Sequence, residues 1–206
     1  MAKKSERTTK QVQRDPNATR QAILDSAVSL FEEYGYDVTS VQQIVDKAER
    51  TKGAFYHHFE SKEDLLHEIQ DGFIDYQLEL ARSVLERHLP SDEKLRRFII
   101  EVLMEPIERY KSEITIYLHE QRFLDEAAFG QIRVKRDELA NIVNGLIERG
   151  VAEGLLRDLG PTRIVSLGII GMTAWAHTWM TSSDTHSPRE IGEIYAAMAL
   201  DGLRMD

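Results

Sequence analysis

The sequence predicts an all-α fold of about nine helices. Apolar residues recur at spacings of three and four along nearly the whole chain, and strict alternation never extends beyond a few positions. Four of the five prolines lie where this periodicity starts or stops, which is typical of residues that open or end helices. With 206 residues, of which 42% are hydrophobic, the chain can form one domain or two small ones around a sizeable core.

The first part of the chain contains four predicted helices. Residues 18–34 carry an apolar stripe, and Gly35 suits the left-handed position that follows a helix. Each of the next three helices has a hydroxyl residue at its start that can accept a hydrogen bond from an orphan backbone amide. These helices and their capping residues are 40–48 with Thr39 or Ser40, 51–59 with Thr51, and 62–88 with Ser61.

The second part contains longer apolar stripes that are interrupted by proline and glycine. The run Ile114–Leu118 is the only strand-like stretch, but its helical neighbours favour a short helix. One predicted helix contains Leu95–Leu103 and is kinked or broken at Pro106, and another contains Leu139–Ile147 and ends near Gly150 or Gly154. Pro161 begins a helix at 161–180, and Pro188 begins the last helix.

Residues 164–183 contain no Asp, Glu, Lys or Arg, so a transmembrane helix has to be considered. Polar residues such as Ser166 and His177 interrupt the run and argue against a membrane span. Burial on two sides, against its own bundle and against a second copy of the chain, explains such a helix better. Gly168 and Gly171 would let a partner backbone approach closely. We therefore expect a homodimer built on the last two helices and no membrane contact.

The net charge of −9 is distributed unevenly. Residues 1–20 carry six basic and two acidic side chains, whereas the residues after Lys62 carry 16 basic and 26 acidic ones. Only the front segment could therefore approach a polyanion. We interpret residues 1–16 as a basic flexible arm, which is either a nucleic-acid contact or a disordered tail.

The chain contains no cysteine, which excludes disulfide frameworks, thiolate metal sites and cysteine nucleophiles. Residues 1–16 are polar and are not followed by the apolar core of a signal peptide, so we expect a cytoplasmic protein. No HExxH, GxSxG, P-loop or GxGxxG pattern occurs, and the histidines lack metal-ligand spacing. We therefore expect neither an enzyme nor a bound cofactor or metal.

The predicted helix at 51–59 has an unusual outer face. Phe55 and Phe59 are one turn apart and must both pack inward. The other positions then present lysine, glycine, tyrosine and histidine to the outside, which suits the phosphate-lined groove of DNA. Taken one at a time, the tyrosine could instead be a half-buried helix residue and the two histidines could be a solvated pair. The candidate contacts are Lys52, Gly53, Tyr56, His57 and His58, with Thr51 at the cap and Lys62 at the start of the next helix.

Three short helices with a tight turn between the second and third have the proportions of a helix-turn-helix. Residues 39–66, TSVQQIVDKAERTKGAFYHHFESKEDLL, resemble the TetR family of transcriptional regulators. The resemblance implies an α-helical dimer. Each chain would have a DNA-binding domain at 17–62 and a ligand-binding and dimerisation domain at 63–206.

The resemblance also implies roles for single residues. Lys52, Gly53 and Tyr56 match positions that touch base edges in the family. The family usually has glycine and an apolar residue in the turn, where this chain has Glu49 and Arg50. We expect Glu49 to strain the turn or to bring an acid near DNA, and Arg50 to compensate by reaching a phosphate. The positions that match phosphate contacts are Thr39, His57, His58 and Lys62.

The body offers aromatic and basic candidates for an effector pocket, which needs apolar walls and a few polar groups. Residues 168–180, GIIGMTAWAHTWM, are similar to the stretch in TetR-family members that answer to acyl-CoA or other lipid-derived ligands. That similarity implies an apolar acid or its CoA thioester, with Arg122, Arg133 or Arg136 opposing the anionic part. Thr173 and His177 are further polar candidates, and most of the aromatic residues are expected to belong to the core. The candidate lining residues are Phe98, Val102, Tyr117, Arg122, Phe123, Arg133, Trp175 and Trp179.

These observations favour a repressor that binds a double-stranded DNA operator. Two recognition helices of a dimer would enter successive major grooves about 34–36 Å apart, and a small-molecule effector would change that spacing by moving the helix at 62–88. The alternatives are an all-helical enzyme, which leaves the outward tyrosine and histidines unexplained, and an adaptor that binds protein through the same head. The operator, the regulated genes and the effector are left open by the sequence.

Overall fold

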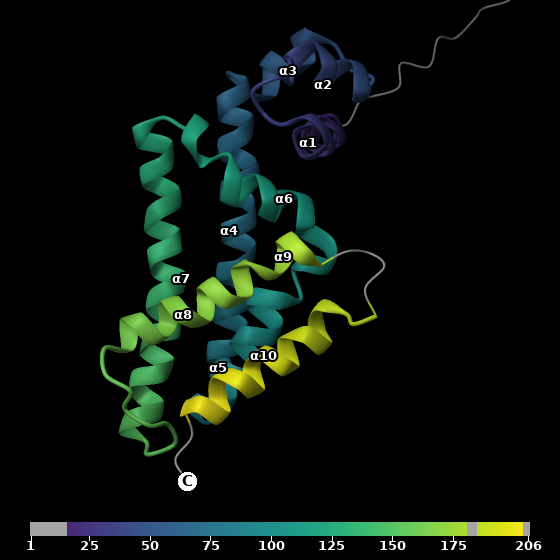
Figure 1. The fold of residues 1–206 in the computed structure, drawn as a ribbon. Helices are drawn as coiled ribbons and strands as arrows, with labels where there is room; N and C mark the ends of the chain where they lie inside the picture. The colour runs from purple at the N-terminus through teal and green to yellow at the C-terminus, as the bar shows by residue number, and fades with distance from the viewer. Residues whose placement is uncertain (1–15, 181–184, 204–206) are drawn as a thin grey trace, which may run out of the picture.

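The computed structural model describes residues 16–180 and 185–203, and every regular element in these two ranges is a helix (Figure 1). With α5 and η1 counted as one helix and α8 and α9 as another, the described ranges hold nine helices and one 3-10 turn. The all-α prediction is therefore confirmed. Of the predicted basic arm, only Pro16 lies within the described residues, as the first residue of α1.

Three helices form a head at one end of the molecule (Figure 1). They pack around the first turns of a long helix, α4, which continues from the head into the body. The head has its own core, in which Ile44, Phe55 and Leu65 are fully buried. The helices of this region are α1 Pro16–Tyr34, α2 Val41–Lys47, α3 Lys52–His58 and α4 Lys62–Glu86.

Side-chain caps start the short head helices as the sequence predicts. Ser40 and Gln43 form a reciprocal capping box at α2: the Ser40 hydroxyl accepts from the Gln43 backbone N–H at 3.3 Å, and the Gln43 side-chain Oε1 accepts from the Ser40 backbone N–H at 2.8 Å. The Thr51 hydroxyl accepts from the Ala54 amide at 3.1 Å, and Ser61 caps α4 in the same way. Of the two candidates for the cap of α2, Ser40 is the one used.

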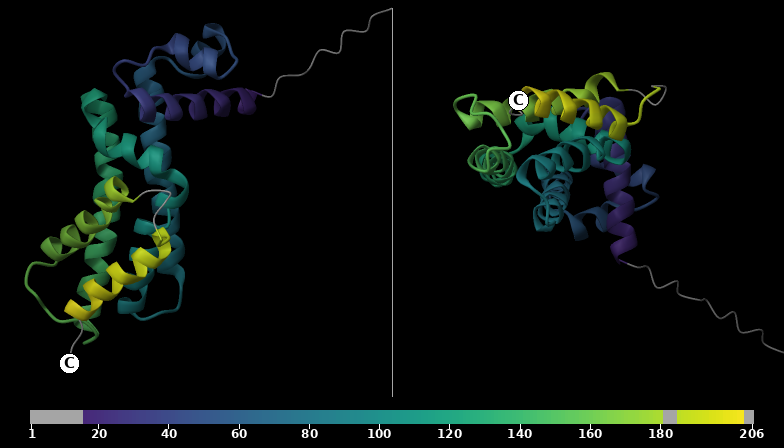
Figure 2. Two further views of the ribbon diagram at one scale, coloured as in Figure 1. Left: turned by 45° about the vertical axis from the view of Figure 1, so that its right-hand side comes forward. Right: turned by 90° about the horizontal axis from the view of Figure 1, so that it is seen from below.

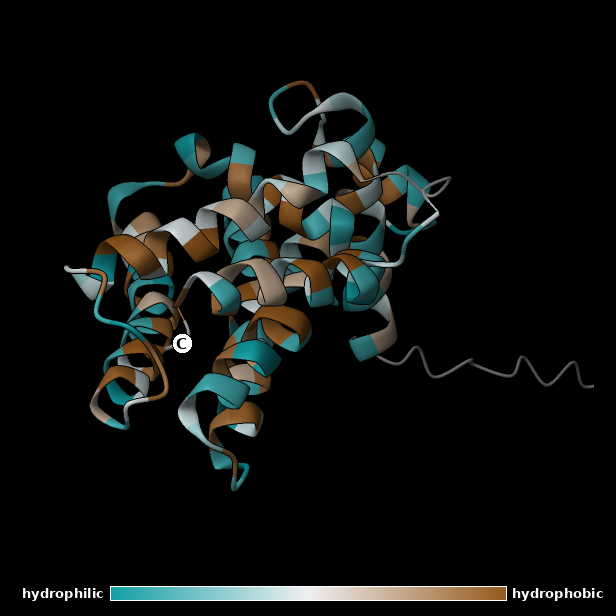
Figure 3. Ribbon diagram, turned by 60° about the horizontal axis from the view of Figure 1, so that its bottom comes forward, coloured by the Kyte–Doolittle hydropathy of each residue, from teal (hydrophilic) through white to brown (hydrophobic). Residues whose placement is uncertain are grey.

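In the elongated body, α5, η1, α6 and α7 pack against α4, and α8 and α10 lie side by side on one outer face (Figure 2). Hydrophobic and hydrophilic residues are interleaved along the helices, as expected of elements with one buried side (Figure 3). The body helices are α5 Ser91–Arg97, which continues into the π-helix η1 Phe98–Met104, then α6 Ile107–His119, the 3-10 turn η2 Gln121–Phe123, α7 Glu126–Ala152, α8 Thr162–Ala174, α9 Ala176–Trp179 and α10 Pro188–Leu203.

The body differs from the prediction in two details. The π-helical hydrogen bonding of η1 was not predicted, because the wider turn depends on packing rather than on a local sequence pattern. The predicted helix at 161–180 is interrupted at Trp175, which separates α8 from α9. The strand-like run Ile114–Leu118 lies within α6, in agreement with the helical prediction.

Gly192 of α10 packs so closely against η1 that a side chain there would meet the backbone. A Cβ atom on Gly192 would be 3.2 Å from the Ile100 Cα and 3.0 Å from the Met104 Cβ. We expect Gly192→Ala to lower the free energy of unfolding by about 1–3 kcal/mol, because the packed core must shift to admit the methyl group. Urea unfolding followed by circular dichroism measures this change.

Gly130 of α7 provides the matched control, because a Cβ atom there meets nothing within 4 Å. We expect Gly130→Ala to raise the free energy of unfolding by about 0.5–1 kcal/mol, since alanine is the better helix former. A Gly192→Ala variant as stable as the parent would contradict the close contact between α10 and η1.

Candidate nucleic-acid interface and internal pocket

The head helix α3 presents a polar face to solvent. Tyr56 is 57% exposed, and Lys52, Gly53 and His57 are exposed as well, whereas Phe55 on the inner side is fully buried. This is the division between inner and outer faces that the helical spacing predicts. It leaves an ammonium, a phenol and an imidazole free to contact a polyanion.

His58 lies at the edge of this face and is half-buried. Its ring is 5.0 Å from that of His57, centroid to centroid, in an edge-to-face arrangement. Burial, followed by the neighbouring His57 and Arg20, lowers the pKa of the His58 imidazole. In the free protein this shift favours the uncharged imidazole, which still offers an N–H donor.

The turn between α2 and α3 holds a strained residue. Glu49 has φ = +54°, in the left-handed region that favours glycine. Arg50 folds back onto the turn, where its Nη1 donates to the Glu49 carbonyl oxygen at 3.0 Å, and its Nε is buried without a hydrogen-bond partner. The strain expected from Glu49 is present, and the Arg50 guanidinium is placed to hold the turn.

Lys62, a predicted phosphate contact, is directed into the head instead. Its ammonium donates to the Tyr36 and Thr39 carbonyl oxygens at 2.8 Å each and to the Asp37 carbonyl oxygen at 3.3 Å. It also lies 4.1 Å from the centre of the Tyr36 ring. Because an ammonium has only three hydrogens, these carbonyls use all of its donors.

Thr39 is also occupied within the head. The side chain is 1% exposed, and its hydroxyl donates to the Gly35 carbonyl oxygen at 2.7 Å. In this structure the side chains of Thr39 and Lys62 are therefore bonded within the head, and their phosphate contacts stay a prediction. The physical reason is that backbone carbonyls of the loop between α1 and α2 lie within hydrogen-bonding distance of these two side chains and accept from them.

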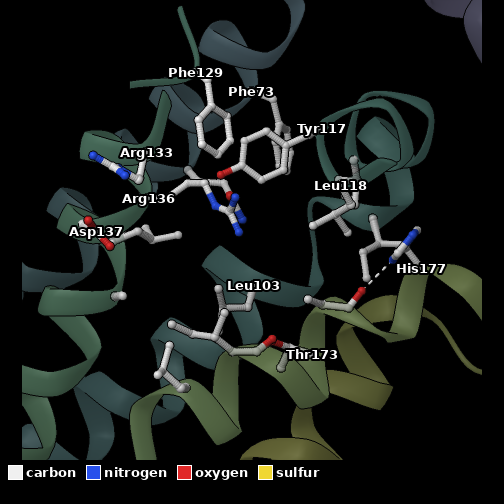
Figure 4. Close-up of a pocket in the computed structure, with 18 of the residues that line it drawn as sticks. Phe73, Leu103, Tyr117, Leu118, Phe129, Arg133, Arg136, Asp137, Thr173 and His177 are labelled. Carbon is white, nitrogen blue, oxygen red and sulfur yellow. Dashed lines mark hydrogen bonds between the residues drawn. The ribbon is translucent and has the colours of Figure 1, made fainter. Parts of the chain in front are cut away.

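The body encloses a cavity of about 360 Å³ between α4, α6, α7 and α8. Most of its wall is apolar, with Phe73, Tyr117 and Phe129 among the aromatic residues (Figure 4). Burial raises the pKa of the Tyr117 phenol, so this hydroxyl stays protonated. The polar wall is mainly basic and includes Arg133, Arg136, Arg163 and His177, with Asp137 and Thr173.

Arg136 is the more buried of the two α7 arginines in this wall. Arg133 and Arg163 are exposed, whereas Arg136 is partly buried, and in Figure 4 it lies beneath the Tyr117 ring. Its guanidinium carbon is 5.5 Å from the centre of that ring. The cavity can therefore accommodate an apolar molecule whose anionic group meets arginine.

The structure brings some of the predicted pocket residues together and separates others. Tyr117 and Arg133 line the cavity, as do Arg136, Thr173 and His177. Phe98 and Val102 are fully buried in the body core and do not line it. Arg122 and Phe123 belong to η2, where Phe123 packs on the head core. Trp175 and Trp179 are 67% and 44% exposed, away from the cavity wall.

Sequence reasoning missed Arg163 and Phe73 as parts of this wall. A signal for the α7 part was present, since Phe129, Arg133, Arg136 and Ala140 follow one another at spacings of four, three and four. These four residues all line the cavity. No comparable local pattern marks Arg163, which reaches the cavity from α8 through tertiary packing.

The outer face of α8, α9 and α10 carries large apolar side chains in solvent. Ile164 and Trp175 are 70% and 67% exposed, and Ile194 and Met198 of α10 are 52% and 60% exposed. Several large exposed apolar side chains on neighbouring helices are typical of an interaction site. None of the helices within the described residues is both long and apolar enough to span a bilayer.

Comparison with known proteins identifies related sequences along nearly the whole chain. Residues 23–69 match the family described as bacterial regulatory proteins, tetR family, and residues 88–203 match the tetracyclin repressor-like C-terminal domain. A Rhodococcus jostii protein named HTH-type transcriptional repressor KstR2 is 30% identical over 186 residues, or 89% of this chain and 90% of that protein. A Mycobacterium tuberculosis protein of the same name is 27% identical over 190 residues, or 91% and 94%.

Solved structures show the same fold. The ketosteroid transcriptional regulator KstR2 of Mycobacterium tuberculosis superposes with a TM-score of 0.83 at 26% identity, over 91% of this chain and 95% of that one. AibR, solved in complex with isovaleryl coenzyme A and operator DNA, gives a TM-score of 0.79 at 24% identity, over 88% and 98%. The second likeness concerns the fold alone.

The left-handed backbone at Glu49 predicts a stabilising substitution. We expect Glu49→Gly to raise the free energy of unfolding by about 0.5–1 kcal/mol, because glycine removes the steric strain, although its greater freedom in the unfolded chain reduces the gain. Thermal unfolding of the purified variant measures the effect. Glu33→Gly, within α1, should instead destabilise the protein by about 1 kcal/mol. A loss of stability in both variants would contradict strain at Glu49.

Proposed function

This chain belongs to the TetR family of bacterial regulatory proteins, and we propose that it is a transcriptional repressor whose operator DNA is released when an apolar acid or its CoA thioester fills the body cavity. The observation that carries the proposal is the coexistence of two separate sites in one chain. The outward face of α3 suits DNA, and the arginine-bearing apolar cavity suits an amphipathic anion.

In the proposed complex, α3 is the recognition helix. Lys52, Gly53 and Tyr56 are exposed on it and would meet base edges, while His57 and His58 would donate to phosphates. The charge distribution supports this polarity, because the negative balance of the chain lies after Lys62. The basic residues 1–15, outside the described part of the chain, would add a further electrostatic contact.

The chemistry of the cavity supports the effector class. An acyl chain would contact the apolar wall, and a carboxylate or the CoA phosphates would reach Arg133, Arg136 or Arg163, whereas Arg122, on η2, does not line the cavity. The relative KstR2 is described as a ketosteroid regulator, and AibR has been solved with a CoA thioester and operator DNA. Both descriptions are compatible with an apolar ligand of this kind.

We further propose that two copies assemble through α8 and α10. The exposed apolar side chains Ile164, Trp175, Ile194 and Met198 would be buried between the copies. Gly168 is exposed with nothing within 4 Å of a Cβ position, so a partner helix could approach closely there. The dimer would present two α3 helices to successive major grooves, about 34–36 Å apart, in the cytoplasm.

DNA binding is tested with DNA from upstream of the protein's own gene, by nuclease footprinting and then by fluorescence anisotropy on the protected segment. We expect Lys52→Met to cost about 1–3 kcal/mol in operator affinity and to relax the preference for the protected sequence, because a base contact is lost. The absence of any protected segment would refute the DNA-binding function.

Lys62→Met provides the contrast. We expect the slope of log affinity against log salt concentration to stay at its wild-type value, because the Lys62 ammonium is used by backbone carbonyls. The melting temperature should fall, because the half-buried carbonyls of Tyr36 and Thr39 lose this donor. A reduced slope at unchanged stability would instead place Lys62 on a phosphate.

Effector binding is tested with a series of acyl-CoAs and the matching free acids, monitored by tryptophan fluorescence and by release of the operator DNA. We expect saturable binding that Arg133→Ala weakens about 10-fold or more, because a charge-assisted hydrogen bond to the anion is lost. Arg149→Ala, on the same helix but outside the cavity wall, should bind like the parent. No response at any chain length would exclude this effector class.

A further inference from the structure

The short turn η2 lies between the cavity and the head. It connects α6, which contributes Tyr117 to the cavity wall, with α7, which contributes Arg136. Its last residue, Phe123, packs on the hydrophobic core of the head rather than on that of the body. The turn η2 is therefore in contact with the hydrophobic core of the head and is directly connected to the two helices that supply these wall residues.

On the cavity side, Gln121 holds the two wall residues together. The Arg136 Nη1 donates to the Gln121 side-chain oxygen at 2.9 Å. The Gln121 side-chain nitrogen donates to the Tyr117 backbone carbonyl at 2.7 Å. This amide thus uses its acceptor on one wall residue and a donor on the other, which fixes the orientation of η2 relative to the cavity.

On the head side, a stack of rings and cations continues from η2. The Arg122 guanidinium carbon lies 4.8 Å from the centre of the Phe123 ring, and the Phe123 ring lies 4.8 Å from that of Tyr36. The Lys62 ammonium lies 4.1 Å from the Tyr36 ring. The same ammonium donates to the Thr39 carbonyl, one residue before the cap of α2.

An anionic ligand in the cavity can break the hydrogen bond between Arg136 and Gln121. An amide oxygen is a weaker acceptor for a guanidinium than a carboxylate or a phosphate, which form charge-assisted hydrogen bonds. Because Arg136 lines the cavity and Gln121 accepts from only one of its five N–H donors, an anion that enters the cavity can bind the remaining donors and draw the guanidinium away from Gln121. No other side chain is shown bonded to this guanidinium among the described residues.

We propose that Gln121 is the positioning residue that couples the effector cavity to the DNA-reading head. This inference rests on the proposed function, whose regulation it specifies. An effector anion draws Arg136 away from Gln121, and η2 loses its fixed orientation. Phe123 then no longer supports Tyr36, and the Lys62 contacts that hold the start of α2 weaken. Since α3 follows α2 through a tight turn, the recognition face shifts and operator affinity falls.

The first test needs no ligand and no DNA. Hydrogen–deuterium exchange compares the full-length parent with Gln121→Ala, in which the Arg136 bond is absent. We expect the amides of α2 and of the loop before it to exchange about 3- to 10-fold faster, because the supporting contacts are weakened. Unchanged exchange in this segment would overturn the proposal.

Ser112→Ala is the matched control. The Ser112 hydroxyl donates to the Glu32 carboxylate at 2.6 Å, so it too joins the body to the head, but outside the stack. Faster exchange at α2 in this variant as well would mean that any loosening of the body from the head has the same effect, and would count against a specific role for Gln121. If Gln121→Ala exchanges faster throughout the chain, Gln121→Asn replaces it, because the shorter amide breaks the bond with less disturbance.

The second test measures coupling with decanoyl-CoA as the probe and the footprinted operator. We expect the loss of operator affinity caused by saturating decanoyl-CoA to be at least 5-fold in the parent and below 2-fold in Gln121→Ala, with decanoyl-CoA still bound by the variant. A full response in Gln121→Ala would overturn the coupling role.

The two tests separate failure of the inference from failure of the proposed function. If the parent binds no operator, or does not respond to decanoyl-CoA, the proposed function fails in that respect, and the exchange experiment still decides whether Gln121 supports the head. If the parent binds and responds while Gln121→Ala behaves like it in both tests, the proposed function stands and the coupling role of Gln121 is refuted.

Discussion

The burial of Phe55 and Phe59 is the constraint on which the outer face of α3 depends. The two side chains are 0% and 1% exposed, and their ring centres are 5.5 Å apart. A rotation of α3 that brought either ring into water would cost about 1.5–3 kcal/mol for each side chain. Tyr56 packs edge-to-face on Phe55 at 5.2 Å, so the same constraint orients the exposed phenol. The polar face is thus a consequence of core packing.

The head could be predicted from the sequence wherever its structure follows from local rules. Helical spacing gave the inner and outer sides of α3, and hydroxyl residues marked the caps at Ser40 and Thr51. Lys62 was assigned differently because its partners at Tyr36 and Thr39 lie 26 and 23 residues away. From the sequence alone, a lysine is expected to carry an exposed charge. Only the tertiary structure shows that backbone carbonyls accept hydrogen bonds from the Lys62 ammonium.

The body was predictable as a set of helices but only partly as a pocket. Aromatic and basic residues identify candidates, and Tyr117 and Arg133 do line the cavity. Phe98 is equally apolar, yet it is fully buried in the core, and Trp175 is mainly exposed on the outer face. Composition cannot separate core, cavity and outer surface, since all three use large apolar side chains. The division depends on how α7 and α8 pack over α4 and α6.

In the proposed mechanism, different groups of the cavity determine how tightly a ligand binds and whether it releases DNA. The body as a whole is acidic and does not attract anions from a distance. Because charges are screened within about 8 Å at physiological ionic strength, the arginines act only on an anion that has reached the cavity. A small inorganic anion would gain that contact but would bury no apolar surface, which is worth about 25 cal/mol for each Å². In the proposed mechanism, affinity would therefore depend mainly on the apolar walls. Arg136 contributes a different property, because it is bonded to Gln121 and so connects the anion to η2. A ligand that fills the walls but lacks an anionic group would leave this bond intact, so in the proposed mechanism it would occupy the cavity without releasing DNA.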